Sequence, residues 1–235
     1  MRAALIAFAT QDARVVAAAE VGSLTNEAGD RWSDLDLTFG LAEDVDPRAF
    51  LEDWTVELAA RWDAVRLFDL MAGVTLYRVF LFPGILQVDL SATAGAVAKT
   101  SPRFNLLFGE AVRDDTPPGV DAAEIFGLCV HHALRARVNI ERGRLWAAEY
   151  WISELRHETL SLAALRRGLP AKYARGFHGL PDALTNRVAD SLVSTVAVGE
   201  LNRALSSAVD ALMEVADGLD QARRMEESLR ELARG

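Results

Sequence analysis

Short apolar stretches alternate with amphipathic ones in the first half of the chain, which indicates a mixture of strands and helices. In the segment LDLTFGL, residues 35–41, apolar and polar positions alternate as on a half-buried strand. Asp46 and Pro47 then supply an N-cap and a first-turn proline for a helix that runs to about Trp62. The other predicted elements of this half are helices over 2–13 and 23–29, a strand ending at Val21, and strands over 64–71, 75–82, 85–92 and 104–108.

The second half follows the helical period almost throughout. It begins after a linker, RDDTPPGVD, that is rich in proline. Gly168 followed by Pro170 is typical of a helix end. The predicted helices cover about 121–140, 144–167, 181–195, 198–216 and 219–234. We therefore expect an α+β fold: an N-terminal domain over 1–115 with a mixed β-sheet flanked by helices, then an all-α helical bundle domain over 121–235.

Composition places the chain among globular proteins. Its 235 residues are 51% apolar and 25% charged, close to the average for soluble domains. The N-terminal apolar run ends at Gln11 and Asp12 without a small-residue cleavage pattern, so it predicts a first helix and no signal peptide. No segment approaches the roughly 18 uninterrupted apolar residues of a membrane span. We therefore expect a cytoplasmic protein with no membrane partner, and the single Cys129 excludes an internal disulfide.

The net charge of −9 bears on the partners of the chain. Proteins that bind nucleic acid usually present a basic surface, so we expect no nucleic-acid partner. An acidic surface attracts a cationic small molecule over long range. The charge is equally consistent with a role in solubility alone.

Candidate chemistry begins where the first strand ends, at Val21-Gly22-Ser23. Backbone N–H groups and a hydroxyl at the start of a helix form a place where a phosphate can bind. Asp34 and Asp36 follow ten residues later, and their spacing puts both carboxylates on one face of a strand. Carboxylates together with substrate phosphates are the oxygen ligands that Mg²⁺ prefers.

Asp89 is the candidate third carboxylate. It lies between Val88 and Leu90 on a predicted interior strand, where burying an aspartate is costly unless it is paired or bound to metal. The turn dipeptide Pro83-Gly84 predicts that this strand pairs antiparallel with its predecessor. Three carboxylates on two neighbouring strands can hold two Mg²⁺ ions roughly 3.5–4 Å apart, as in two-metal displacement at phosphorus.

The pattern of Gly22-Ser23, Asp34-Leu35-Asp36 and Asp89 resembles the DNA polymerase β-like nucleotidyltransferase superfamily. Trp32-Ser33 and the helical second half are similar to its antibiotic-modifying branch, which includes aminoglycoside and lincosamide nucleotidyltransferases. The motif resemblance covers about residues 15–90.

This resemblance implies that Gly22 and Ser23 bind the nucleotide phosphates, while Asp34, Asp36 and Asp89 hold two Mg²⁺ ions. It implies transfer of AMP from ATP to a hydroxyl of a small acceptor, with release of pyrophosphate, and a role in antibiotic resistance. Glu27 departs from the small residues usual in this loop, and we expect it to point outward from the triphosphate.

The general base is left open by the sequence. Glu149 and Arg156 share one predicted helix face, which can line a cleft or form an ordinary half-buried ion pair. We favour Glu149 as the base, with Asp89 as the alternative, and Lys172 as a loop residue that reaches the triphosphate. The same helical region offers further candidates for proton transfer or for stacking on the acceptor: His131, His132, Trp146, Tyr150, Trp151, Glu154 and Glu158.

Two other functions remain open at this stage. One is a protein-modifying nucleotidyltransferase of the toxin–antitoxin type, although such catalytic domains are commonly shorter. The other is a nucleotide-binding protein without activity. The helical half can also pair two chains, so a homodimer is possible.

Overall fold

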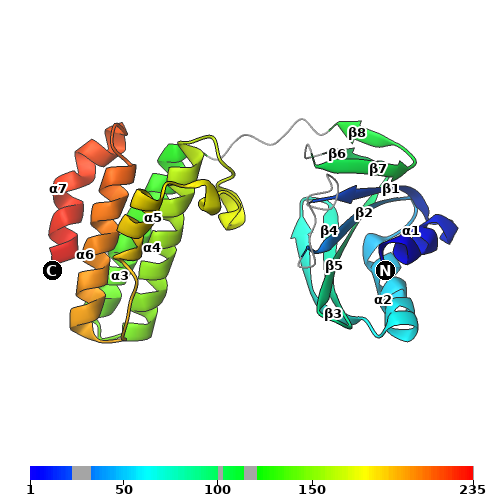
Figure 1. Cartoon of the computed structure of the whole chain (residues 1–235), viewed down its shortest axis with the longest axis horizontal. Helices are drawn as coiled ribbons and strands as arrows, with labels where there is room; N and C mark the ends of the chain where they lie inside the picture. The colour runs from blue at the N-terminus through cyan, green and yellow to red at the C-terminus, as the bar shows by residue number, and fades with distance from the viewer. Residues whose placement is uncertain (23–32, 100–102, 114–120, 235) are drawn as a thin grey trace. The chain divides into compact units, whose positions relative to one another are not determined.

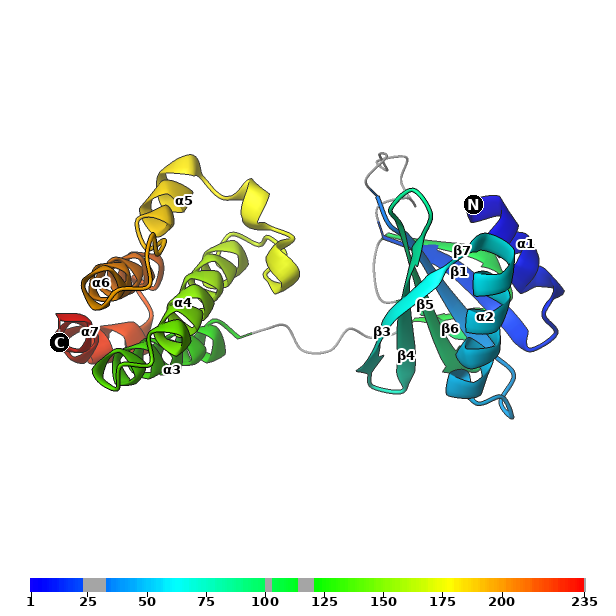
Figure 2. The same cartoon turned by 90° about the horizontal axis from the view of Figure 1, so that it is seen from below.

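The computed structural model describes residues 1–22, 33–99, 103–113 and 121–234. The chain divides into two compact units, Met1–Pro117 and Pro118–Gly235, which are described one at a time (Figures 1 and 2). The first combines a mixed sheet with helices and the second is helical. The predicted fold class is therefore confirmed. In the described part of the chain, no helix combines the length and apolar character that crossing a bilayer requires.

The N-terminal unit is built on a six-stranded sheet with the order β3-β4-β5-β2-β1-β7. Strands β2 and β5 are parallel, and the other neighbours in this sheet are antiparallel. Two further short strands, β6 and β8, pair in parallel. The strands are β1 (Val15–Val21), β2 (Leu35–Leu41), β3 (Val65–Ala72), β4 (Thr75–Phe82), β5 (Leu86–Ala94), β6 (Val97–Lys99), β7 (Phe104–Phe108) and β8 (Ala111–Arg113).

Helices α1 (Arg2–Gln11) and α2 (Pro47–Trp62) cover one face of this sheet (Figures 1 and 2). Asp46 caps α2 as predicted, since its carboxylate accepts hydrogen bonds from the backbone N–H groups of Arg48 and Ala49. Trp54 of α2 is 1% exposed and packs in the core between helices and sheet. The apolar residues of β2 and β5 alternate into this core, so the residues between them point to the other face.

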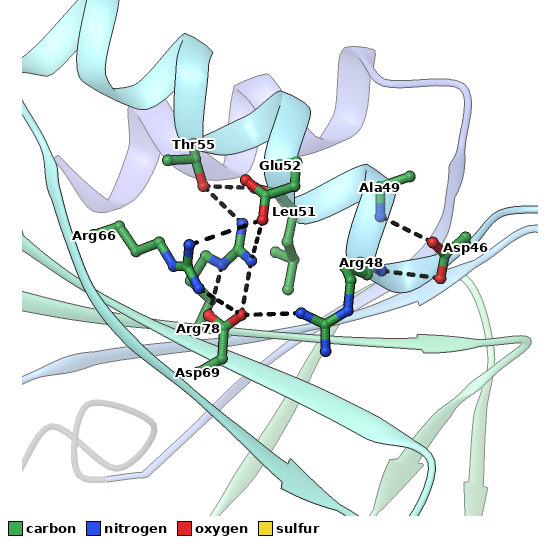
Figure 3. A network of polar contacts seen from close by, with 9 residues as sticks. All are labelled: Asp46, Arg48, Ala49, Leu51, Glu52, Thr55, Arg66, Asp69 and Arg78. Carbon is green, nitrogen blue, oxygen red and sulfur yellow. Dashed lines mark hydrogen bonds and ion pairs between the residues drawn. The ribbon is translucent and has the colours of Figure 1, made fainter.

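A buried arginine ties α2 to strands β3 and β4 (Figure 3). Arg78 is fully buried, and its guanidinium donates two hydrogen bonds to Asp69, at 2.7 and 2.8 Å. It also donates to Glu52 at 2.8 Å and to Thr55 at 2.9 Å, both on α2. A buried guanidinium requires such partners, so the network fixes the packing of α2 against these strands.

The C-terminal unit is a helical bundle around a separate apolar core. Arg137 fixes the C-terminal end of the last helix of this bundle, because its guanidinium donates hydrogen bonds to the backbone carbonyls of Leu232 and Ala233. The helices are α3 (Ala122–Glu141), α4 (Leu145–Leu165), α5 (Asp182–Ala189), α6 (Val198–Val215) and α7 (Asp220–Arg234), with 3₁₀ turns at Lys172–Ala174 and Phe177–Gly179.

The structure departs from the sequence predictions in two respects, and one further prediction lies outside the described residues. The helix predicted over 181–195 ends at Ala189, and an irregular segment follows it. Strands β6 and β8 were not predicted, because three residues are too few to show a period. The helix expected over 23–29 lies outside the described residues.

Candidate functional site

The strand pairing brings the three predicted aspartates to one place. In the parallel register of β2 and β5, Asp36 lies directly opposite Asp89, and Asp34 immediately precedes β2. Leu35 and Leu37 are 2% and 1% exposed and point into the helix-covered core. Because strand side chains alternate, Asp34 and Asp36 point to the opposite face of the sheet.

The three carboxylates form a cluster suited to a divalent cation. One oxygen from each of Asp34, Asp36 and Asp89 lies within 4.8 Å of the others, and all three residues are half-buried. Burial raises the pKa of Asp89, and the nearby charge of Asp34 raises it further. A hydrogen bond of 2.9 Å from Gln87 Nε2 to Asp89 Oδ1 partly offsets these effects, because it lowers the pKa of Asp89. Like charges held this close favour a bound cation, and carboxylate oxygens are the ligands that Mg²⁺ takes.

Gly22 ends β1 beside this cluster. Its φ of +85° favours glycine, and its backbone N–H donates to the carbonyl of Arg103 at 3.2 Å. A Cβ atom at Gly22 would overlap Oδ2 of Asp36. The positive φ and this overlap both favour glycine here, and the described half of the Gly-Ser motif adjoins the aspartate cluster.

The remaining predicted site residues lie outside the described residues or in the other unit. Ser23 and Glu27 lie outside the described residues. Glu149 belongs to α4 and Lys172 to a 3₁₀ turn, both in the C-terminal unit, which is described by itself. Their proposed roles at the site stay predictions.

Glu149 is positioned by a chain of polar contacts on α4. Ser153 Oγ donates to Glu149 Oε1 at 2.8 Å, and Arg156 donates to the same hydroxyl at 2.7 Å. Arg156 also donates to the carbonyl of Ser191 at 3.0 Å. Burial lowers the pKa of Arg156, and the charge of Glu149 opposes that shift. The predicted face that Glu149 shares with Arg156 therefore exists as a half-buried, hydrogen-bonded row.

The aromatic residues of α4 divide between surface and interior. Trp146 and Tyr150 are 76% and 52% exposed. Trp151 instead packs against the two histidines of α3, with ring centroids 5.7 Å from His131 and 5.2 Å from His132. The exposed pair remains available to stack on a ligand, whereas Trp151 has a structural role.

Two features near the aspartates were missed at the sequence level. Gln87 is two residues from Asp89 on the same strand, and this spacing is the signal that could have identified it. The second is an exposed apolar surface on β3, whose strand positions Phe68 and Leu70 are 49% and 57% exposed. A local bulge hides the alternation of this strand, so the sequence pattern gives no clear face.

Comparison with known proteins yields structural similarity alone. No family model matches the chain, and no curated protein matches it. An aminoglycoside 6-adenyltransferase from Bacillus subtilis aligns over 99% of this chain and 97% of its own, with a TM-score of 0.39 and 14% identity. A nucleotidyltransferase-like protein from Exiguobacterium sibiricum 255-15 aligns over 99% of this chain and 85% of its own, with a TM-score of 0.37 and 14% identity.

One of these solved structures is an adenyltransferase, and the other is described as nucleotidyltransferase-like. At these TM-scores and identities they establish neither the activity nor the substrate of this chain. The functional conclusion below therefore depends on the aspartate cluster and its surroundings.

Proposed function

We propose that this protein is a Mg²⁺-dependent nucleotidyltransferase that transfers AMP from ATP to a hydroxyl of a small acceptor and releases pyrophosphate. The observation that carries the proposal is the convergence of Asp34, Asp36 and Asp89 on one sheet face. Gly22 adjoins this cluster at the end of β1, where the sequence predicts a phosphate-binding turn. Three carboxylates beside a phosphate site can hold the metal ions that assist displacement at phosphorus.

The residues take distinct roles in this reaction. Asp34 and Asp36 hold the metal that binds the nucleotide, and Asp89 joins them in holding the catalytic metal. When bound, the two Mg²⁺ ions lower the pKa of the acceptor hydroxyl and neutralise charge on the triphosphate. The acceptor oxygen forms a bond to the α-phosphorus while the bond from that phosphorus to the pyrophosphate oxygen breaks. Gly22 and Ser23 form the turn that orients the phosphates, and Ser23 supplies a backbone N–H and a hydroxyl as donors.

The acceptor-side roles are assigned to the C-terminal unit. Glu149 accepts the proton of the acceptor hydroxyl, because Ser153, itself held by Arg156, keeps its carboxylate oriented. Lys172 contacts the triphosphate. In this assignment the catalytic domain is the N-terminal part predicted over 1–115, and the helical bundle over 121–235 selects the acceptor.

The proposed acceptor is a small cationic molecule such as an aminoglycoside, in keeping with the net charge of −9. The biological setting proposed with it is antibiotic resistance in the cytoplasm. The chain acts alone or as a homodimer, and neither membrane nor nucleic acid takes part.

The test is pyrophosphate release with ATP, Mg²⁺ and a panel of aminoglycosides and lincosamides, followed by mass spectrometry of every component. Asp34→Asn serves as the inactive comparison. A small molecule that gains the mass of AMP only with the unaltered protein supports the proposal and names the acceptor. AMP found on a polypeptide instead would favour the protein-modifying alternative. No binding of Mg²⁺·ATP in calorimetry would refute the proposed activity.

A further inference from the structure

Strands β3 and β4 continue the face of the sheet on which the aspartates lie. A bulge between Arg66 and Phe68 shifts the register of β3, and it places Phe68 opposite Val79 and Leu70 opposite Tyr77. These two strands direct eight side chains to this face. Ala72 and Thr75 lie at the hairpin end, and the other six are apolar or aromatic. These six are Val65, Phe68, Leu70, Tyr77, Val79 and Leu81, and we call them the β3–β4 apolar surface.

The charged residues of the same strands all point to the helix-covered face. Arg66, Asp69 and Arg78 meet there with Glu52 of α2 (Figure 3). The bulge is what separates the two sets, because strict alternation would put Arg66 and Asp69 on opposite faces. The β3–β4 apolar surface therefore carries no charged side chain.

Four residues of this surface are exposed to an extent that is unusual for such residues, whereas Val79 is 4% exposed and Leu81 is half-buried. Val65, Phe68 and Leu70 are 59%, 49% and 57% exposed, and Tyr77 is 37% exposed. Single exposed apolar residues are ordinary, but a contiguous group of them marks a binding surface in soluble proteins.

The strand positions of the apolar surface adjoin those of the aspartate cluster. Across the sheet, Val21, Asp36, Asp89, Val79 and Phe68 occupy successive strands in one row. Adjacent strands are about 4.8 Å apart, so Phe68 lies roughly 10 Å from Asp89, the length of a small ring system. Gly22 and the predicted phosphate turn follow β1, on the opposite side of Asp89 from β3 and β4.

We propose that the β3–β4 apolar surface binds an uncharged hydrocarbon or aromatic ring portion of the acceptor, next to the hydroxyl that reacts. This inference rests on the proposed nucleotidyl transfer and narrows its acceptor, from the aminoglycosides named above to molecules with an apolar portion beside the reacting hydroxyl. With the triphosphate on the Gly22 side, the acceptor hydroxyl approaches Asp89 from the side of β4 and β3. A polycation that bound to the β3–β4 apolar surface would lose hydration free energy, and no carboxylate of that surface would compensate for the loss. An apolar ring would gain free energy there, because its burial removes apolar surface from water. Any positive charge of the acceptor therefore lies away from the reacting hydroxyl.

The test uses methyl-labelled full-length protein with Mg²⁺ and the non-hydrolysable analogue AMPCPP. The two probes are lincomycin, which has hydroxyls and an apolar portion, and kanamycin, which has hydroxyls and several amines. The methyl resonances of Leu70, Val79 and Leu81 report binding at the apolar surface. We expect lincomycin to shift these resonances and kanamycin to leave them unchanged.

Two variants of β3 make the test specific. Phe68→Ala should weaken lincomycin binding by about 5- to 10-fold, as expected when an aromatic contact is removed from a binding surface. Met71→Ala should leave it unchanged, because Met71 is 59% exposed on the same strand but pairs with Leu76 of the core face. Both wild-type residues are exposed, so neither variant should fail to fold.

The outcomes separate this inference from the proposed function. Methyl shifts with kanamycin alone, or with neither probe, would overturn it even if AMPCPP binds at the aspartates. Methyl shifts that depend on protein concentration would also overturn it, because a second copy of the chain then covers the surface. Loss of AMPCPP binding, by contrast, is a failure of the nucleotidyl-transfer proposal.

Discussion

Asp36 and Asp89 lie opposite each other on two neighbouring parallel strands, although they are 53 positions apart in the sequence. Parallel pairing of β2 and β5 puts their side chains on one face at a fixed separation. The chain thereby holds two carboxylates near each other before any cation binds. Burial and the nearby Asp34 raise the pKa of Asp89, and a bound cation would relieve this cost.

Replacing an aspartate of the cluster by asparagine should remove metal binding. Asp36→Asn should weaken Mn²⁺ binding and lower nucleotidyl transfer by at least about 100-fold, since changes even to residues behind metal ligands cost 10- to 100-fold. Calorimetry with Mn²⁺ measures the affinity, and pyrophosphate release measures the activity. Asp44→Asn is the control, because Asp44 is exposed just after β2. Equal Mn²⁺ affinity in both variants would show that the cluster is not a metal site.

Gly22→Ala should impair the site without unfolding the protein. An added Cβ overlaps Oδ2 of Asp36, so that carboxylate must move, while the positive φ costs about 1–2 kcal/mol. Gly73→Ala is a matched control: Gly73 also has a positive φ, of 59°, but a Cβ there has no neighbour within 4 Å. We expect similar losses of stability in urea but a loss of Mn²⁺ affinity in Gly22→Ala alone. Normal metal binding by that variant would contradict the proposed contact.

Arg78→Met should destabilise the N-terminal unit strongly. It leaves Asp69 and Glu52 without their buried partner, and breaking a buried ion pair costs about 3–5 kcal/mol. Arg61→Met, which removes an exposed pair with Glu57, should cost less than about 1 kcal/mol. Urea unfolding compares the two variants. If they unfold at the same denaturant concentration, the network in Figure 3 contributes little to stability.

The stability of the C-terminal unit should fall in mild acid. Burial lowers the pKa of His132 below its ordinary value of 6.5, against an opposing effect of Glu154, and His131 lowers it further. The unfolded chain therefore takes up a proton at a higher pH than the folded chain. Stability is fully present above about pH 6.5 and decreases as the pH falls toward the folded-state pKa.

His132→Phe removes this titration and keeps an aromatic ring beside Trp151. Urea unfolding followed by far-UV circular dichroism between pH 7.5 and 5 should show a smaller acid-dependent loss of stability in this variant. His131→Gln changes an exposed histidine and should retain most of the loss. An identical pH dependence in wild-type protein and His132→Phe would show that His132 is not the group responsible.

Local sequence patterns predicted most elements because the signals are local. Alternation in LDLTFGL and the Asp46-Pro47 start of α2 depend on residues that touch within one strand or one turn. The antiparallel pairing of β4 with β5 likewise follows from the Pro83-Gly84 turn between them. Residues 181–195 show the limit of this reasoning, because helical periodicity alone did not mark the end of α5 at Ala189.

The sequence by itself determined which residues can form the metal site: three aspartates at strand positions and a glycine where β1 ends. Tertiary structure decided which other residues lie next to them in space. Only the parallel register of β2 with β5 sets Asp36 opposite Asp89, and only the packing of the β1 end explains why Gly22 must be glycine. The same holds for β3, where a bulge assigns Phe68 to the aspartate face and Asp69 to Arg78. Register and bulges depend on strands that are distant in sequence, so no local pattern can encode them alone.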